Sequence, residues 1–461
     1  MNEYLIICVV FAIFFYRALL CGYVVDDVTW HAKIAEGKKT KFKGWKLKHK
    51  VHMFLYGAGI FKNGFQEHLF TSSIHLINSL LIYKVTGSLL ASLLYMVNPV
   101  NNQTVLWLNG RRYSVCVLCC LLAWNFKVLM IPLFAFSAFI HVSGIMLPFV
   151  FLFTEYWYMT PLAVILGAIV GFTKFQNIYN SRKETFSKDN ELQKLTWKKI
   201  IISIKSLGFY FTHILCPQKP TMYHQFLYYF GRYDRAIKDG YSLNFTFWKG
   251  LAICSFLMYE IIAHQNIWAI WFLAFQIQYS GILTVTMTVA DRYTCISSIG
   301  VMMILVKYVD MLPDPYRVIA YTAIFAYYFT KYQPLFRAYT NIEEFYLYQI
   351  NLQPEGVDAR CLLAELYITR RRLYSAFSVI QQGLIYRKGE FKLTLTMVRV
   401  LLELQRYDEA LSVMAIAIKN APVGEDEEAK EAYDDLVQQV AGIKLQVRMG
   451  AMNRSDKRKM A

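Results

Sequence analysis

The chain reads CGYVVDDVTWH from residue 21 to residue 31, directly after an apolar stretch over residues 5–20. Two adjacent carboxylates, Asp26 and Asp27, therefore stand where a hydrophobic helix would leave the lipid, with His31 close behind them. An acidic pair at this boundary can accept a proton or hold a cation. The pair could equally be an ordinary solvated turn beside a membrane span, and the pair alone does not separate these two interpretations.

Composition indicates a membrane protein. Of the 461 residues, 56% are hydrophobic and 16% aromatic, and the mean hydropathy is positive, which argues against a soluble globular protein. Lysine and arginine outnumber aspartate and glutamate by 49 to 32. In membrane proteins such an excess of positive charge binds anionic lipid headgroups and sets the orientation of the spans. No basic folded module stands out, so we do not expect nucleic-acid binding. The first apolar stretch lacks a basic start and a small-residue cleavage site, which favours a retained span.

Further apolar stretches predict a polytopic helical domain. We expect spans or half-spans near residues 66–85, 87–107, 114–129, 131–148, 149–157, 161–172, 200–216, 245–263, 267–289, 293–309 and 315–332. Several are shorter than the ~20 residues that a perpendicular span needs, so tilted or partial helices are expected. The sequence NPVNN at residues 98–102 breaks the second stretch and favours a segment that lines a protein-enclosed cavity.

A repeat follows the apolar half of the chain. Ala376 and Ala410 lie 34 residues apart at matching positions of two predicted helix pairs, and 34 residues is the tetratricopeptide period. A generic array of helical hairpins is the alternative. The predicted fold is therefore all-α, with a polytopic membrane domain over residues 1–333, a small tetratricopeptide-repeat domain over residues 334–450, and a basic tail over residues 451–461.

Four stretches together resemble one family, the transmembrane O-mannosyltransferases with tetratricopeptide repeats, which belong to the polytopic GT-C glycosyltransferases. They are the acidic pair after the first span, EHLFTSSIHLINSLL at 67–81, LASLLYMVNPVNNQTV with the following GRR over 90–112, and VADRYTCISSIG at 289–300. The chain departs from the family pattern where Asn98 replaces a histidine, where Ser297 replaces a proline, and where IHVSG at 140–144 lacks an expected Lys-Glu. These departures leave open a divergent donor or a loss of activity.

The resemblance implies that a sugar, a hexose such as mannose, passes from a polyisoprenyl phosphate to an acceptor hydroxyl on protein. A hydroxyl is a poor nucleophile at neutral pH, so a carboxylate must take its proton, and Asp26 or Asp27 is the expected general base. The titrations of two adjacent acids are coupled, which leaves the assignment between them open.

The departing lipid phosphate requires fixed positive charge. Arg111 with Arg112, and Arg292 with Asp291, are the expected substrate-binding residues, because a guanidinium matches phosphate oxygens well. His31 is added for its closeness to the acids. The alternatives are a membrane-edge charge cluster for the first pair and a structural ion pair for the second.

No metal cofactor is predicted, although a divalent ion between the two N-terminal acids is conceivable. Expected partners are the lipid-linked sugar, membrane lipids, an acceptor polypeptide and a protein partner on the repeats. The lysine-rich residues 33–50 could guide an anionic carrier. The expected location is the endoplasmic reticulum membrane or a bacterial inner membrane.

Two other functions compete with the transferase. One is a non-catalytic membrane scaffold that recruits partners through its helical repeats. The other is a transporter or flippase, which needs two related halves around a midplane site. The sequence shows no such internal symmetry.

Overall fold

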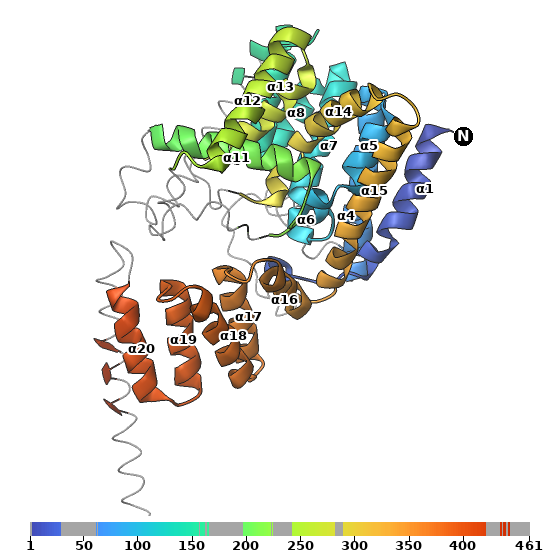
Figure 1. The fold of residues 1–461 in the computed structure, drawn as a ribbon. Coiled ribbons are helices and arrows are strands. Elements are labelled where there is room, and N and C mark those ends of the chain that lie inside the picture. The colour runs from blue at the N-terminus through green and yellow to red at the C-terminus, as the bar shows by residue number, and fades with distance from the viewer. Residues whose placement is uncertain are drawn as a thin grey trace, which may run out of the picture. The chain divides into compact units, whose positions relative to one another are not determined.

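A computed structural model describes residues 2–28, 61, 63–155, 157–161, 164–165, 197–222, 224, 242–281, 289–420, 434–435, 437–438 and 441–442. Every regular element among these residues is a helix, which confirms the all-α class. The chain divides into two compact units, Met1–Phe345 and Tyr346–Ala461 (Figure 1).

The division lies later than the expected boundary at residue 333. Helix α15 (Tyr316–Ala338) continues through Pro334, although an internal proline costs a helix about 3 kcal/mol. Phe336, beyond the proline, is buried and packs against Phe14 and Phe15 with ring centroids 6.4 and 6.2 Å apart. This packing holds the end of α15 on the N-terminal helix, so the first unit extends past the proline.

The first unit consists of long helices joined by short helical turns. The long helices are α1 (Glu3–Phe15), α4 (Gly64–Thr86), α5 (Leu89–Val97), α7 (Arg111–Asn125), α8 (Met130–Ile140), α11 (Trp197–Leu215), α12 (Phe245–His264), α13 (Ile267–Ile277), α14 (Ser297–Asp310) and α15. The short elements are η1 (Tyr16–Leu20), η2 (Pro99–Asn101), α6 (Asn102–Val105), η3 (Leu108–Gly110), η4 (Lys127–Leu129), η5 (Val142–Met146), α9 (Leu147–Phe151), η6 (Trp157–Met159) and η9 (Asp291–Thr294).

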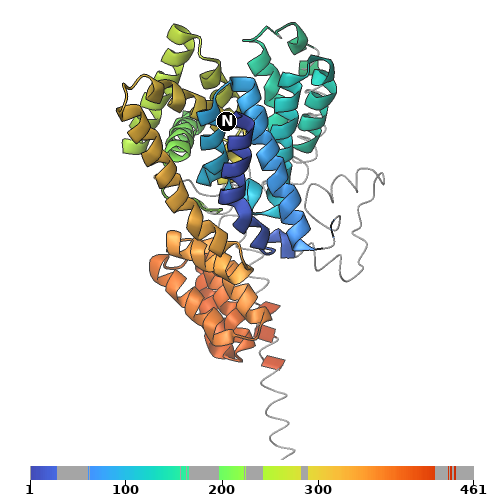
Figure 2. The same cartoon turned by 90° about the vertical axis from the view of Figure 1, so that its right-hand side faces the viewer.

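Local sequence sets the limits of α4, the helix that packs beside α1 (Figure 2). The Asn63 side chain accepts a hydrogen bond from the Gln66 amide at 2.9 Å, which caps the first turn. Gly87 ends the helix with a φ of 67°, a left-handed conformation that glycine adopts at little cost. These two residues set the length of α4, the helix against which α1 packs.

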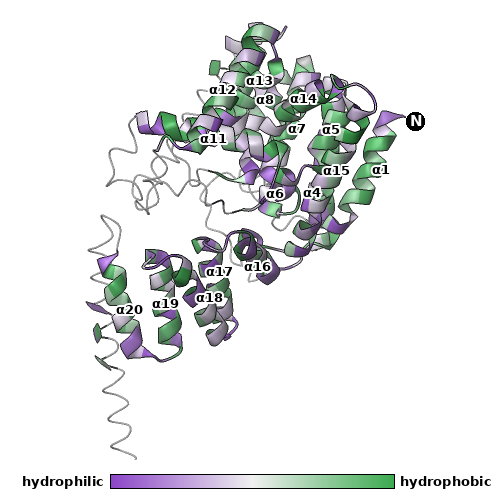
Figure 3. Cartoon of the chain, in the orientation of Figure 1, coloured by the Kyte–Doolittle hydropathy of each residue, from purple (hydrophilic) through white to green (hydrophobic). Residues whose placement is uncertain are grey.

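Membrane-spanning character is limited among the described residues. Two helical segments, Glu3–Leu20 and Phe245–His264, are long and apolar enough to cross a membrane, and a third is formed if the bent pair Pro99–Val105 and Leu108–Asn125 is one span. Figure 3 shows the hydrophobic colouring that runs along α1 and α12. Within the described residues these are fewer than the expected spans and half-spans; α8 and α13, for example, have only 11 residues each, too few to cross a bilayer upright.

The second unit contains two helical hairpins built on the same plan. The first pairs α17 (Val357–Thr369) with α18 (Leu373–Tyr386), and the second pairs α19 (Phe391–Glu403) with α20 (Tyr407–Lys419); α16 (Ile342–Leu352) precedes both. Corresponding helices begin 34 residues apart. Ala376 and Ala410 are both fully buried, and Arg371 and Gln405 both adopt a positive φ between paired helices. The predicted tail over 451–461 lies outside the described residues.

Helices α11 and α12 cross at two facing glycines. A Cβ added at Gly208 would lie 2.4 Å from the Gly250 Cα, and one added at Gly250 would lie 2.3 Å from the Ile204 carbonyl oxygen. Small residues at a crossing let two helix backbones approach closely. The crossing fixes α11, which carries a residue of the site described below.

We predict that Gly250→Ala destabilises the chain by about 1–3 kcal/mol, because the added methyl overpacks the crossing. The expected result is a lower thermal unfolding midpoint in detergent. Gly64→Ala is the control, because its Cβ would make only an ordinary 3.5 Å contact with the Tyr23 ring. Equal midpoints for Gly250→Ala and the unchanged chain would contradict the close crossing.

Candidate active site

A bent segment between α5 and α7 is the centre of the candidate site. We call residues 98–112 the central segment. Within it the chain bends by 98° between the helical stretches Pro99–Val105 and Leu108–Asn125, and the side chains of Asn98, Asn101, Asn102, Gln103, Thr104 and Asn109 are buried. A Cβ at Gly110 would lie 1.8 Å from the Gln103 carbonyl oxygen, so only glycine permits this bend. The break predicted from NPVNN is therefore an irregular segment enclosed by protein.

Asp27 is fixed to one end of the central segment. Its carboxylate accepts hydrogen bonds from the amides of Leu108 at 3.2 Å and Asn109 at 3.0 Å. These amides begin η3, where the cap residue Trp107 offers no side-chain acceptor. Asp27 thus caps a short helix that lies 81 residues away in the sequence.

Asp26 differs from its neighbour in exposure. Its side chain is exposed, whereas that of Asp27 is buried, and its carboxylate accepts a hydrogen bond from Asn109 Nδ2 at 3.0 Å. Val25, just before the pair, has a φ of 52°, a left-handed conformation that is rare for a β-branched residue. His31, the third predicted residue of this stretch, lies outside the described residues.

Arg111 is enclosed in the protein interior. Its guanidinium contacts Glu67 Oε2 at 2.5 Å and Thr71 Oγ1 at 2.9 Å, and both charged side chains have no exposed surface. A buried ion pair of this kind neutralises both charges. Its stacking over the Phe70 ring, at 5.3 Å, further encloses the guanidinium.

Arg292 and Arg112 meet at a pair of tyrosines. Arg292 Nη1 donates to Gln103 Oε1 of the central segment at 3.3 Å and lies 5.0 Å from the centre of the Tyr293 ring. Arg112 lies 5.1 Å from the centre of the Tyr113 ring, and the two tyrosine rings are 6.4 Å apart. Arginines distant in sequence therefore lie on adjacent aromatic rings.

A hydroxyl network extends this aromatic group. Tyr279 stacks on Tyr293 with centroids 4.1 Å apart, and its hydroxyl lies 2.6 Å from the Ser143 hydroxyl. Ser143 also contacts His141 Nδ1 at 2.9 Å. His141 and Ser143 belong to the IHVSG stretch, where the family resemblance led us to expect a Lys-Glu pair. The polar side chains of His141 and Ser143 occupy that place instead.

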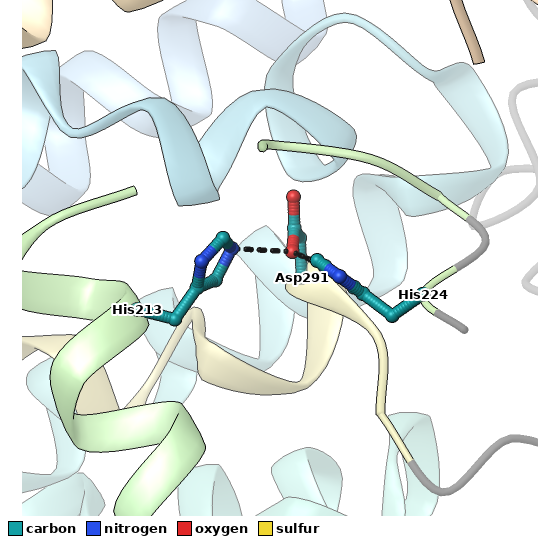
Figure 4. A group of neighbouring side chains, drawn as sticks. All are labelled: His213, His224 and Asp291. Atoms are coloured by element: carbon teal, nitrogen blue, oxygen red, sulfur yellow. Dashed lines mark hydrogen bonds and ion pairs between the residues drawn. The ribbon is translucent and has the colours of Figure 1, made fainter. Parts of the chain in front are cut away.

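Asp291, predicted to act with Arg292, makes its contacts elsewhere. Its carboxylate accepts a hydrogen bond from His213 Nε2 at 3.0 Å and also contacts His224 (Figure 4). It further accepts hydrogen bonds from the Thr221 amide at 2.9 Å and from Asn102 Nδ2 at 3.4 Å. Burial alone raises the pKa of Asp291, but the two histidines outweigh it and bring the pKa to about 2. The sequence analysis missed both histidines, because an isolated histidine is usually a packing residue.

The central segment therefore touches every described group that was predicted from sequence. Asn109 binds both N-terminal acids, and Gln103 and Asn102 bind Arg292 and Asp291. Arg111 and Arg112 belong to the segment itself.

Comparison with known proteins gives no match: no family model fits the sequence, and no curated protein or solved structure is similar to it.

We predict that Asp27 makes stability depend on pH. Burial raises its pKa to about 8, against hydrogen bonds from Asn109 and Leu108 that lower it, whereas the unfolded value is 3.8. The folded chain therefore holds one proton more between these pH values. Its contribution to stability is complete below pH 3.8 and falls by about 1.4 kcal/mol per pH unit until pH 8.

The check is the thermal unfolding midpoint from pH 5 to pH 9. The midpoint of the unchanged chain should fall with rising pH relative to that of Asp27→Asn, which cannot titrate there. Parallel curves for the two proteins would show that Asp27 is charged throughout this range.

Proposed function

We propose that the chain is a membrane glycosyltransferase that transfers a hexose, such as mannose, from a polyisoprenyl phosphate to a hydroxyl of a protein acceptor. One observation supports this proposal above all. A single buried segment binds the N-terminal acids through Asn109 and Arg292 through Gln103. The central segment thus binds both the acids that could accept a proton and the arginine that could stabilise the leaving phosphate. Transfer from a lipid phosphate requires both groups at one site.

In this proposal Asp26 is the general base and Asp27 is a positioning residue. The exposed carboxylate of Asp26 can reach an acceptor hydroxyl, and Asn109 Nδ2 orients it. Asp27 is buried on backbone amides and cannot approach a substrate without breaking them. The acceptor oxygen attacks the anomeric carbon, its proton goes to Asp26, and the lipid phosphate leaves with the bonding electrons. A single displacement of this kind inverts the anomeric centre.

Arg292 and Arg112 are the residues that we assign to the leaving phosphate. Both lie over tyrosine rings, contacts in which a guanidinium keeps its positive charge. Arg111 is excluded from this role, because Glu67 already neutralises its charge. Gln103 positions Arg292 through its side-chain oxygen.

The same proposal assigns a protein family to each of the two units. We assign the first unit to the GT-C class and the second to the tetratricopeptide repeats, with the 34-residue spacing of the hairpins as support. The chain would then be a multi-pass protein of the endoplasmic reticulum or a bacterial inner membrane, and the repeats would bind the acceptor or a protein partner.

The test uses the purified full chain in detergent with dolichyl phosphate [³H]mannose and a mixture of serine- and threonine-rich peptides. Asp26→Asn should lower label transfer by about 10²–10⁴-fold, the contribution of a general base, without a change in the unfolding midpoint. Asp314→Asn is the matched control, because this aspartate is exposed and pairs with Arg317 at the start of α15. Full transfer by Asp26→Asn would reject the proposal.

A scaffold function is the second candidate, and the paired hairpins of the second unit favour it. A scaffold would keep its cellular effect in the Asp26→Asn variant and lose it when residues 346–461 are removed. A transferase gives the opposite result for the first variant.

A further inference from the structure

We propose that His213, His224 and Asp291 bind a divalent transition-metal ion, with zinc as the best fit. One ligand atom from each of the three residues lies within 4.8 Å of the other two. This site is separate from the N-terminal acids and does not rest on the proposed transferase activity.

Three separate pieces of chain supply the ligands. His213 lies near the end of α11, His224 lies beyond it, and Asp291 begins η9. In Figure 4 the two imidazole rings approach the same carboxylate oxygen from opposite sides. All three side chains are enclosed, with 6%, 4% and 0% exposed surface. Convergence of buried ligands from distant positions is typical of a metal site.

The spacing suits a tetrahedral ion. Ligand atoms 2.0–2.1 Å from zinc in a tetrahedron lie about 3.3 Å from one another. The His213 Nε2 to Asp291 Oδ1 distance of 3.0 Å is close to this value, whereas the closer contact between His224 Nε2 and Asp291 Oδ1 must open before an ion can enter. A fourth position remains for water or another ligand.

The donor set selects zinc over the hard cations. Two imidazoles and one carboxylate form a common zinc set, whereas magnesium and calcium prefer oxygen ligands alone. Both histidine Nε2 atoms face the carboxylate, which is the face a shared metal would use.

Neighbouring groups would orient these ligands. The second carboxylate oxygen of Asp291 accepts from the Thr221 amide at 2.9 Å and from Asn102 Nδ2 at 3.4 Å. The Phe209 ring stacks on His213 at 5.1 Å and meets His224 edge-on at 5.3 Å. Such contacts fix carboxylate and imidazole orientation and reduce access of water.

The experiment measures metal in the full-length chain, purified in detergent without a histidine tag and without chelator. Elemental analysis should find close to one zinc per chain. His213→Gln and Asp291→Ala should each lower the zinc content at least tenfold. His264→Gln is the matched control, because this histidine is 42% exposed and lies on α12 away from the cluster.

A second measurement covers variants that fail to fold. Treatment of the unchanged chain with a chelator should lower its unfolding midpoint, and zinc but not magnesium should restore it. Asn102→Ala should weaken zinc binding 10–100-fold and leave one site per chain. A chain that contains no transition metal and does not respond to added zinc would overturn the proposal and leave a hydrogen-bonded cluster.

Discussion

The first unit depends on the burial of a bent, polar segment between α5 and α7. Its backbone amides and amide side chains would be costly inside the protein without partners. Asp27 satisfies the amides at one end, and residues from later parts of the chain satisfy the other end. The same requirement that stabilises the segment therefore brings Asp27, Asp291 and Arg292 to it.

Asp26 and Asp27 are adjacent in sequence but have different surroundings. Asp27 is buried and caps η3, while Asp26 is exposed and accepts a hydrogen bond from Asn109. The two neighbouring arginines divide in the same way, since Arg111 is neutralised by Glu67 and Arg112 lies over an aromatic ring. In each pair, one member is buried on a partner from another element, and the other member is the one that we propose to contact the substrate.

Sequence alone predicted the all-α class, whereas the described residues hold only two or three of the expected membrane spans. Apolar stretches, the break at NPVNN and the 34-residue period are local signals, and helices stand at most of the expected places. The division of roles within Asp26-Asp27 and Arg111-Arg112 was out of reach, because it depends on Glu67 and Leu108 from other elements. The His213, His224 and Asp291 cluster was missed for the same reason. His213 and His224 lie 78 and 67 residues before Asp291 in the sequence. No sequence motif surrounds either histidine.

The proposed sugar transfer requires that Asp26, Arg112 and Arg292 face one bound substrate. The most direct measurement is a cryo-electron-microscopy structure of the full chain with dolichyl phosphate mannose bound. The account predicts phosphate oxygens within hydrogen-bond distance of Arg292 or Arg112, and the anomeric carbon on the side from which Asp26 can receive the acceptor's proton. A carrier phosphate bound away from both arginines, with Asp26 facing only solvent, would contradict it.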